Sequence, residues 1–385
     1  MPLDAAELIA ASRAATGLTA FGDVDPRESL ERLVASLNDE ANLTESGAAA
    51  KKSSLVRVLS NRLLLQDALA RRPEIEAESI RPPVVITGLQ RSGTTKLHRM
   101  IAADADMQKL PLWRLLYPVQ TAQVPPGERD PRILATQMFV DAVRERSPET
   151  YAAHPMMVLE PDEEYFAMEI SFQAHINTSS FRTPSYEAWL NAQPFDNWYS
   201  WLRKFLQYAQ FTDRAAGRPW VLKAPHHLGY LPLLFKHFPR TVVVHCHRDP
   251  AVAIASFSGL LLAARRSTTR EPLPAEVGAY CLKYCSQRLN DYLRDRAALE
   301  KRHTFVDVSY GEIVSDASGV IRRIYEAAGL PLTPAALKAM QAWEVSNAQH
   351  KHGSHRYSFA DFDLDEARIA EATRPYTERF ASYLR

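Results

Sequence analysis

The segment Gly88–Thr95 has the residue types and the spacing of a site that binds an anion. It reads Gly-Leu-Gln-Arg-Ser-Gly-Thr-Thr and lies between the β-branched run Val84–Thr87, which predicts a buried strand, and an apolar pattern at helical spacing. A glycine-containing turn in this context brings backbone N–H groups and the positive end of a helix dipole to one point. The pattern therefore predicts a phosphate-type loop, with Arg91 as its cation.

Position 94 distinguishes this loop from that of a nucleotide hydrolase. The Walker pattern requires a lysine there, which reaches the β- and γ-phosphates, but this chain has Thr94. Arg91 supplies a cation from a different point, which suits a shorter 5′ anion without an obligatory γ-phosphate or magnesium ion. A turn that binds nothing is the alternative interpretation.

A second anion site is predicted at the end of another strand. Thr241–Cys246 is the clearest strand pattern of the chain, and Arg248 follows it just before a helical pattern. An arginine at the carboxyl end of a sheet strand lies where open α/β sheets bind ligands, and a guanidinium fits phosphate oxygens as a fork. Ser256, about two helical turns further on, can add a hydroxyl. Alternatively, Arg248 pairs with Asp249 or caps a neighbouring helix.

The elements that position these loops alternate between strand and helix. Further strands are predicted at Trp220–Leu222 and Thr304–Val308, and a helical pattern follows each predicted strand. This order indicates an α/β fold whose parallel sheet is flanked by helices. Residues 1–80 carry apolar side chains at helical spacing and are predicted to form a helical extension ahead of an α/β domain, 81–385.

Bulk composition excludes several classes of protein. The 46 basic and 45 acidic side chains give a formal charge of +1, which argues against binding nucleic acid or an anionic membrane through overall charge. Three cysteines cannot form a disulfide framework, and no matching Cys/His pair indicates a metal site. The start of the chain lacks the basic residues of a secretory signal, and Ala251–Ala264, the longest uncharged apolar stretch, is shorter than the roughly 20 residues of a membrane span. The predicted location is the cytoplasm.

Taken in this order, the motifs resemble the sulfotransferases that use 3′-phosphoadenosine 5′-phosphosulfate (PAPS). The loop is similar to that of the bacterial branch, which reads G-x-x-R-[ST]-G-T-T, and the family's arginine and serine eight residues apart match Arg248 and Ser256. The resemblance implies that these two residues bind the 3′-phosphate of PAPS. It also implies that the 5′-phosphosulfate is bound by Arg91, Ser92, Gly93, Thr94 and Thr95.

Further segments extend the resemblance to about residues 82–385. Val221–Leu228 looks like the family segment that brings a lysine, here Lys223, and a histidine beside the transferred sulfate. The tyrosine that lies near the adenine in the family corresponds to Tyr310. A looser similarity at 351–358 to the family's closing loop implies that Lys351 and Gly353 contact the nucleotide. The implied fold is a P-loop-like α/β domain.

The resemblance implies in-line transfer of a sulfuryl group to an acceptor oxygen or nitrogen, with adenosine 3′,5′-bisphosphate as the product. Negative charge grows on the bridging oxygen of the leaving group, so a cation at that oxygen stabilises the transition state. Arg91 is the first candidate for this cation and Lys223 is the second. No metal ion is expected.

The general base stays open between two kinds of residue. Glu163 best fits the bacterial pattern of the family, although acidic residues at a helix start also stabilise the helix dipole without catalysing anything. In the animal members one residue separates the lysine from the catalytic histidine, but here Pro225 holds that place, which shifts His226 and His227 along the chain. His227 is the second candidate because histidine titrates near neutral pH. The remaining candidates are His154 and Glu164.

Aromatic residues concentrate between residues 110 and 215. Helices and loops of this region, including a helix predicted over Glu163–Gln173, are expected to cover the carboxyl edge of the sheet and form an acceptor pocket. This predicts a small, moderately apolar hydroxylated acceptor such as a lipid, sterol, phenol or polyketide-like molecule. A P-loop kinase-like phosphotransferase and a non-catalytic phosphoadenosine-binding protein are the alternatives. The sequence does not decide between a monomer and a homodimer.

Overall fold

Four short strands form a parallel sheet in the part of the chain that the structure describes. The computed structural model describes residues 2–121, 124–125, 127–347 and 358–384. The spatial order of the strands is β2-β1-β3-β4, and their bounds are β1 (Val84–Thr87), β2 (Val221–Lys223), β3 (Val242–His247) and β4 (Thr304–Ser309). Each predicted strand lies within one residue of an observed one. The predicted α/β fold, with a parallel sheet flanked by helices, is confirmed.

Strands β1, β2 and β3 are buried on both faces, as expected for β-branched runs in a parallel sheet, whereas the edge strand β4 begins exposed at Thr304. Their side chains alternate, so Val85 and Val243 belong to the core under α12–α14, while Ile86 and Val244 belong to the core under α4 and α16. Because the strands are parallel, the residues that follow β1, β2 and β3 lie at the same edge of the sheet, between these two layers of helices.

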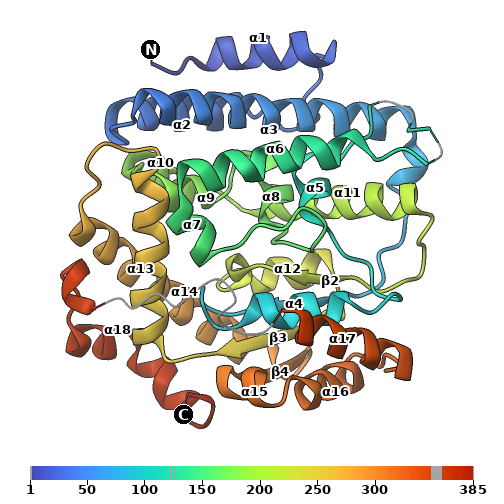
Figure 1. The fold of residues 1–385 in the computed structure, drawn as a ribbon, viewed down its shortest axis with the longest axis vertical. Coiled ribbons are helices and arrows are strands. Elements are labelled where there is room, and N and C mark those ends of the chain that lie inside the picture. The colour runs from blue at the N-terminus through green and yellow to red at the C-terminus, as the bar shows by residue number, and fades with distance from the viewer. Residues whose placement is uncertain (1, 122–123, 126, 348–357, 385) are drawn as a thin grey trace.

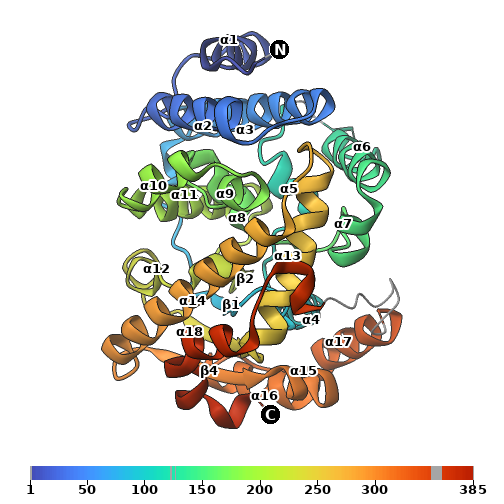
Figure 2. The same ribbon diagram turned by 90° about the vertical axis from the view of Figure 1, so that its left-hand side faces the viewer.

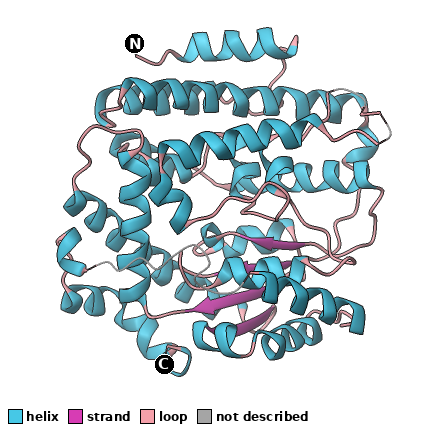
Figure 3. Cartoon of the chain, in the orientation of Figure 1, coloured by secondary structure: helices cyan, strands magenta, loops and turns pink. Residues whose placement is uncertain are grey.

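Helices cover both faces of the sheet (Figures 1 and 3). The first of them, α4, begins directly after the loop that follows β1. The helices of this part are α4 (Thr94–Ala102), α12 (Leu231–His237), α13 (Pro250–Arg266), α14 (Pro274–Leu299), α15 (Tyr310–Ser315), α16 (Ala317–Ala327), α17 (Pro334–Ser346) and α18 (Glu366–Arg379). Short 3₁₀ turns lie at η1 (Pro73–Ile75), η3 (Pro225–His227), η4 (Phe359–Phe362) and η5 (Ala381–Tyr383).

A layer of mostly short helices lies above the carboxyl edge of the sheet. Its members are α5 (Leu112–Leu116), α6 (Pro131–Arg146), α7 (Pro148–Ala153), α8 (Tyr165–Met168), α9 (Ile176–Ser180), α10 (Pro184–Asn191) and α11 (Asp196–Asp213). The helix predicted over Glu163–Gln173 is interrupted, since α8 gives way to the 3₁₀ turn η2 (Glu169–Ser171) and Phe172 ends it with a φ of 58°. These short pieces allow successive side chains to point in different directions.

Three N-terminal helices form the outermost layer, farthest from the sheet in both views (Figures 1 and 2). They are α1 (Ala5–Thr16), α2 (Arg27–Glu40) and α3 (Glu45–Arg71). Leu30 and Leu59 of this layer belong to the same hydrophobic core as Trp198 and Val85. The division into 1–80 and 81–385 stays a prediction. None of the described helices combines the length and the apolar character that a bilayer crossing requires.

Candidate active site

The loop between β1 and α4 depends on two glycines. Gly93 has a φ of 87°, which favours glycine, and a Cβ there would lie 3.2 Å from the ring of Tyr310. A Cβ on Gly88 would lie 2.5 Å from the carbonyl oxygen of Cys246 at the end of β3. The glycines thus let the loop pass close to β3 and turn into α4, whose first N–H groups have no partner within the helix.

A cavity of about 350 Å³ opens beside this loop, at the carboxyl edge of the sheet. One end is polar and includes Gln90, Arg91, Gly93, Thr94, Thr95, Arg248 and Tyr310. The rest of the wall is mostly apolar, with the hydroxyls of Thr150, Ser179 and Ser180 beside the side chains of Met156, Tyr165, Phe166, Ile176, Phe257, Leu260, Leu261 and Ala264. Glu163, His154 and His226 also line the cavity. The arrangement suits an anionic donor at one end and an apolar acceptor at the other.

The two predicted anion-binding segments meet at Arg91. Its Nε donates to Ser256 Oγ (3.2 Å), and its Nη1 donates to the carbonyl oxygen of Ala153 (2.8 Å) at the end of α7. Arg248 donates to the main-chain oxygen of Arg91, and its guanidinium carbon lies 4.1 Å from the ring centroid of Tyr310. The structure therefore places Arg91, Arg248, Ser256 and Tyr310 together. Ser92 is buried within the loop, where its hydroxyl donates to Leu89.

Lys223 and Glu163 are in direct contact, and Glu163 lines the cavity whereas Lys223 lies just behind it. Lys223, at the end of β2, is 1% exposed, and its Nζ lies 2.6 Å from Glu163 Oε1 and 3.4 Å from Thr95 Oγ1. The shorter distance is that of a charge-assisted hydrogen bond. Two residues that the sequence places 60 positions apart thus form one acid–base pair beside the start of α4.

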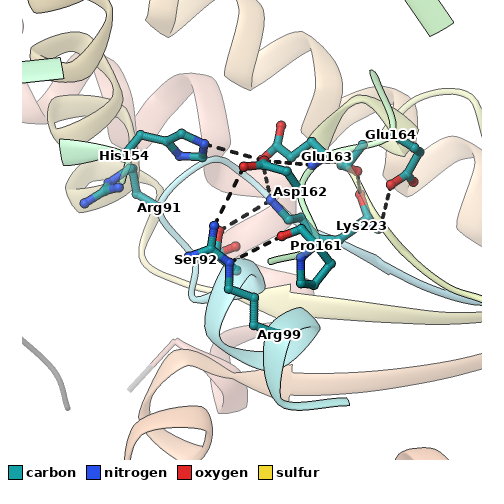
Figure 4. A network of polar contacts seen from close by, with 12 residues as sticks. Arg91, Ser92, Arg99, His154, Pro161, Asp162, Glu163, Glu164 and Lys223 are labelled. Atoms are coloured by element: carbon teal, nitrogen blue, oxygen red, sulfur yellow. Dashed lines mark hydrogen bonds and ion pairs between the residues drawn. The ribbon is translucent and has the colours of Figure 1, made fainter. Parts of the chain in front are cut away.

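The side chains of the acidic residues 162–164 point in different directions and make different contacts (Figure 4). Asp162 is buried and lies 3.7 Å from both Arg99 Nη2 and His154 Nε2, and its Oδ1 accepts from the N–H of Glu163 (2.8 Å). Burial by itself raises the pKa of Asp162, but His154, Lys223 and Arg99 outweigh that effect and hold the pKa well below its usual value. Asp162 is therefore an anion that fixes the backbone of Glu163.

Glu164 lies at the centre of a buried hydrogen-bond chain, and this chain contains His227. Glu164 Oε1 lies 2.7 Å from His227 Nε2, and Oε2 accepts from the backbone N–H of Lys223 (2.7 Å). The other ring nitrogen of His227, Nδ1, lies 2.8 Å from the hydroxyl of Tyr199. His227 is 0% exposed and, like Lys223, does not line the cavity, and both of its ring nitrogens have partners within this chain.

His226 lines the cavity in place of its neighbour. The 3₁₀ turn η3 sends the two adjacent rings to different sides. Burial, reinforced by the neighbouring His227 and Arg288, lowers the pKa of His226 to about 3, so its imidazole is neutral at physiological pH.

Several contributors were not predicted from the sequence. Arg99 gives only the weak signal of a charged residue inside an apolar helical pattern, and Tyr199 resembles many other aromatics of its region.

Lys351 and Gly353 lie outside the described residues, and their contacts with a nucleotide stay predictions.

Comparison with known proteins supports the class that this fold and cavity define. The model of the sulfotransferase family matches residues 82–334, which is more than half of the chain. The chain therefore belongs to the sulfotransferase family. Sulfuryl transfer is the reaction of this family, in contrast to the phosphoryl transfer considered as an alternative.

Mycobacterial sulfotransferases are among its relatives. The omega-hydroxy-β-dihydromenaquinone-9 sulfotransferase Stf3 of Mycobacterium bovis is 24% identical over 290 residues, which cover 71% of this chain and 70% of the relative. The crystal structure of sulfotransferase STF1 from Mycobacterium tuberculosis H37Rv matches with a TM-score of 0.83 and 29% identity, covering 96% of this chain and 98% of that one. STF9 from Mycobacterium avium shares the fold, with a TM-score of 0.86, 23% identity and coverage of 97% and 96%.

Proposed function

We propose that this sulfotransferase takes the sulfuryl group from PAPS and passes it to a hydroxyl or amine of a small, moderately apolar acceptor. The contact between Lys223 and Glu163 beside Thr95 carries the proposal, because a cation and a carboxylate meet at the start of α4. A cation there suits the developing charge of a leaving group, and a carboxylate there suits the proton of an acceptor hydroxyl.

Donor binding is assigned to two groups of residues. The 5′-phosphosulfate is assigned to the start of α4, since a helix N-terminus that opens into a cavity binds anions through its N–H groups. The residues proposed for it are Arg91, Ser92, Gly93, Thr94 and Thr95. The 3′-phosphate is assigned to Arg248 and Ser256, which both contact Arg91. The adenine is assigned to Tyr310, and Lys351 and Gly353 stay proposed contacts of the nucleotide.

In the proposed step, Glu163 accepts the proton of the acceptor hydroxyl while the acceptor oxygen bonds to sulfur. The bond between sulfur and the bridging oxygen breaks, and adenosine 3′,5′-bisphosphate leaves with that oxygen. Lys223 and Arg91 stabilise the charge on it; Arg91 acts as a fixed cation because arginine does not release its proton. No metal ion takes part in this step.

His227 has a positioning role in this proposal. It holds Glu164, and Glu164 holds the backbone N–H of Lys223. The pair therefore fixes the end of β2 from the buried side, while Glu163 contacts the same lysine from the cavity side. A buried carboxylate with a partner on each oxygen gives the rigid support that catalytic geometry requires.

The acceptor is assigned to the apolar end of the cavity. Phe257, Leu260 and Leu261 of α13 face this space together with Tyr165 and Phe166. Such a wall favours a molecule that buries carbon atoms, since burial of apolar area contributes most of the affinity at such sites. The relative Stf3 is named for an omega-hydroxylated dihydromenaquinone, which supports an apolar hydroxylated acceptor here.

The proposal is tested with a metabolite extract and PAPS that carries labelled sulfur. Purified protein should convert at least one extract component into a product heavier by one SO₃ unit, measured by mass spectrometry. The Lys223→Ala variant is the matched control and should form this product at least about tenfold more slowly. A wild-type protein that folds and binds adenosine 3′,5′-bisphosphate, yet transfers no label to any component of an apolar or a polar extract, would contradict catalysis.

A further inference from the structure

A buried polar network supports the ends of β3 and β4 and takes no part in the step proposed above. His247, the last residue of β3, places Nδ1 2.7 Å from the hydroxyl of Tyr376 and Nε2 3.0 Å from Asp307 Oδ1. Arg296 forks onto the same carboxylate, with Nη1 donating to Oδ1 (3.1 Å) and Nη2 to Oδ2 (2.9 Å). The order of contacts is Tyr376–His247–Asp307–Arg296.

The four residues come from four elements: α18, β3, β4 and α14. His247, Tyr376 and Arg296 are buried, and burial of such groups is stable only when their polar atoms have partners. The ring of His247 also packs on Phe380, with 4.4 Å between ring centroids. The network therefore ties the C-terminal helix to the two strands as one unit.

A metal ion does not account for this cluster. In the described part of the chain, His245, His247 and Asp307 are the group whose ligand atoms lie close enough together to hold a metal. However, both ring nitrogens of His247 already have partners, and the guanidinium of Arg296 occupies both oxygens of Asp307. A positive charge at that position opposes a second cation.

The network lies directly behind the residues assigned to the nucleotide. His247 immediately precedes Arg248, and His247 pairs in register with Ser309, the residue before Tyr310. Arg248 stacks on Tyr310 at 4.1 Å, so the two strand ends share one contact in front of the network. A shift of His247 would move the backbone that carries Arg248.

We propose that Tyr376, His247, Asp307 and Arg296 form a C-terminal clasp, through which α18 positions Arg248 for the 3′-phosphate. They are positioning residues, because none of them lines the cavity. The inference rests on the proposed function in one respect, namely that Arg248 binds the 3′-phosphate. The new claim is that α18 contributes to the preference for adenosine 3′,5′-bisphosphate over AMP, which lacks the 3′-phosphate.

Calorimetry of two nucleotides tests the clasp without an acceptor. Wild type, Tyr376→Phe and Tyr383→Phe are titrated with adenosine 3′,5′-bisphosphate and with AMP. Tyr376→Phe removes the hydroxyl that contacts His247 and should weaken binding of the bisphosphate about threefold to tenfold, while AMP binding changes less than about twofold. Tyr383→Phe is the matched control, because the Tyr383 ring also packs on His247 (4.9 Å between centroids) but its hydroxyl makes no hydrogen bond within the clasp. It should behave as wild type.

Circular dichroism and a thermal melt accompany each titration, and Arg296→Lys replaces Tyr376→Phe if the latter does not fold. Equal losses for both nucleotides, or an unchanged bisphosphate affinity in a folded Tyr376→Phe variant, would overturn the clasp alone. A wild type that binds both nucleotides equally would overturn the proposed function, and the clasp with it.

Discussion

The proposed donor side and the proposed acceptor side of the cavity are built in different ways. The donor side consists of the loop 88–95 and the ends of strands, so backbone N–H groups and two arginines do most of the proposed binding. The acceptor side combines short helices between residues 148 and 180 with part of α13, and tertiary contacts fix its carboxylates: Glu163 contacts Lys223 of the donor side, and Glu164 contacts His227. A site built from a loop and strand ends can be detected from a short sequence pattern. Side chains that are positioned by contacts between distant segments give no such pattern.

The acidic run shows this difference most clearly. Asp162, Glu163 and Glu164 are consecutive, yet one fixes backbone beside Arg99, one faces the cavity and one is buried against His227. The three residues precede α8, which begins at Tyr165, so irregular backbone and tertiary contacts set the direction of each side chain.

The largest expected effect separates Glu163 from His227 as the base. Glu163→Gln keeps the shape of the side chain but removes its ability to accept a proton, so turnover should fall about 10²- to 10⁴-fold. Affinity for adenosine 3′,5′-bisphosphate should change little. Turnover is measured with labelled PAPS and the acceptor that the extract screen identifies. Near wild-type turnover in Glu163→Gln would place the base elsewhere, with His226 and His154 as the remaining cavity-lining candidates.

The next effect concerns the cations of the donor side. Lys223→Ala and Arg91→Ala should each lower turnover more than about tenfold, because each removes a charge from the leaving oxygen. Both variants should keep the far-ultraviolet circular dichroism of the wild type. If both turn over at the wild-type rate, the assignment of the leaving-group cations is wrong.

The smallest effect tests the support of the acceptor side. Glu164→Gln retains an oxygen that can accept from the N–H of Lys223, whereas Glu164→Ala retains none. We expect Glu164→Gln to lower turnover severalfold and Glu164→Ala to lower it further, with His227→Asn close to the former. The same ranking should appear in turnover but not in nucleotide affinity. If His227→Asn lowers turnover as much as Glu163→Gln does, His227 takes part in proton transfer.

The sequence predicted the strands and the loop that follows β1 because their signals are local. The four strands, the loop Gly88–Thr95 and the position of Lys223 at a strand end follow from residue type and short-range spacing. The contacts that hold Asp162, Glu163 and Glu164 do not follow in this way, since their partners Arg99, Lys223 and His227 come from separate elements. The sequence also does not indicate which of the two adjacent histidine rings faces the cavity, because the 3₁₀ turn at 225–227 determines their directions. The C-terminal clasp joins residues more than 120 positions apart and has no local pattern.

Titration of the wild-type protein with adenosine 3′,5′-bisphosphate and with AMP tests the central assignment most directly. The account predicts that the bisphosphate binds at least about tenfold more tightly, because Arg248 and Ser256 add charge-assisted contacts to the 3′-phosphate. Equal affinities, or no binding of the bisphosphate to the folded protein, would contradict it.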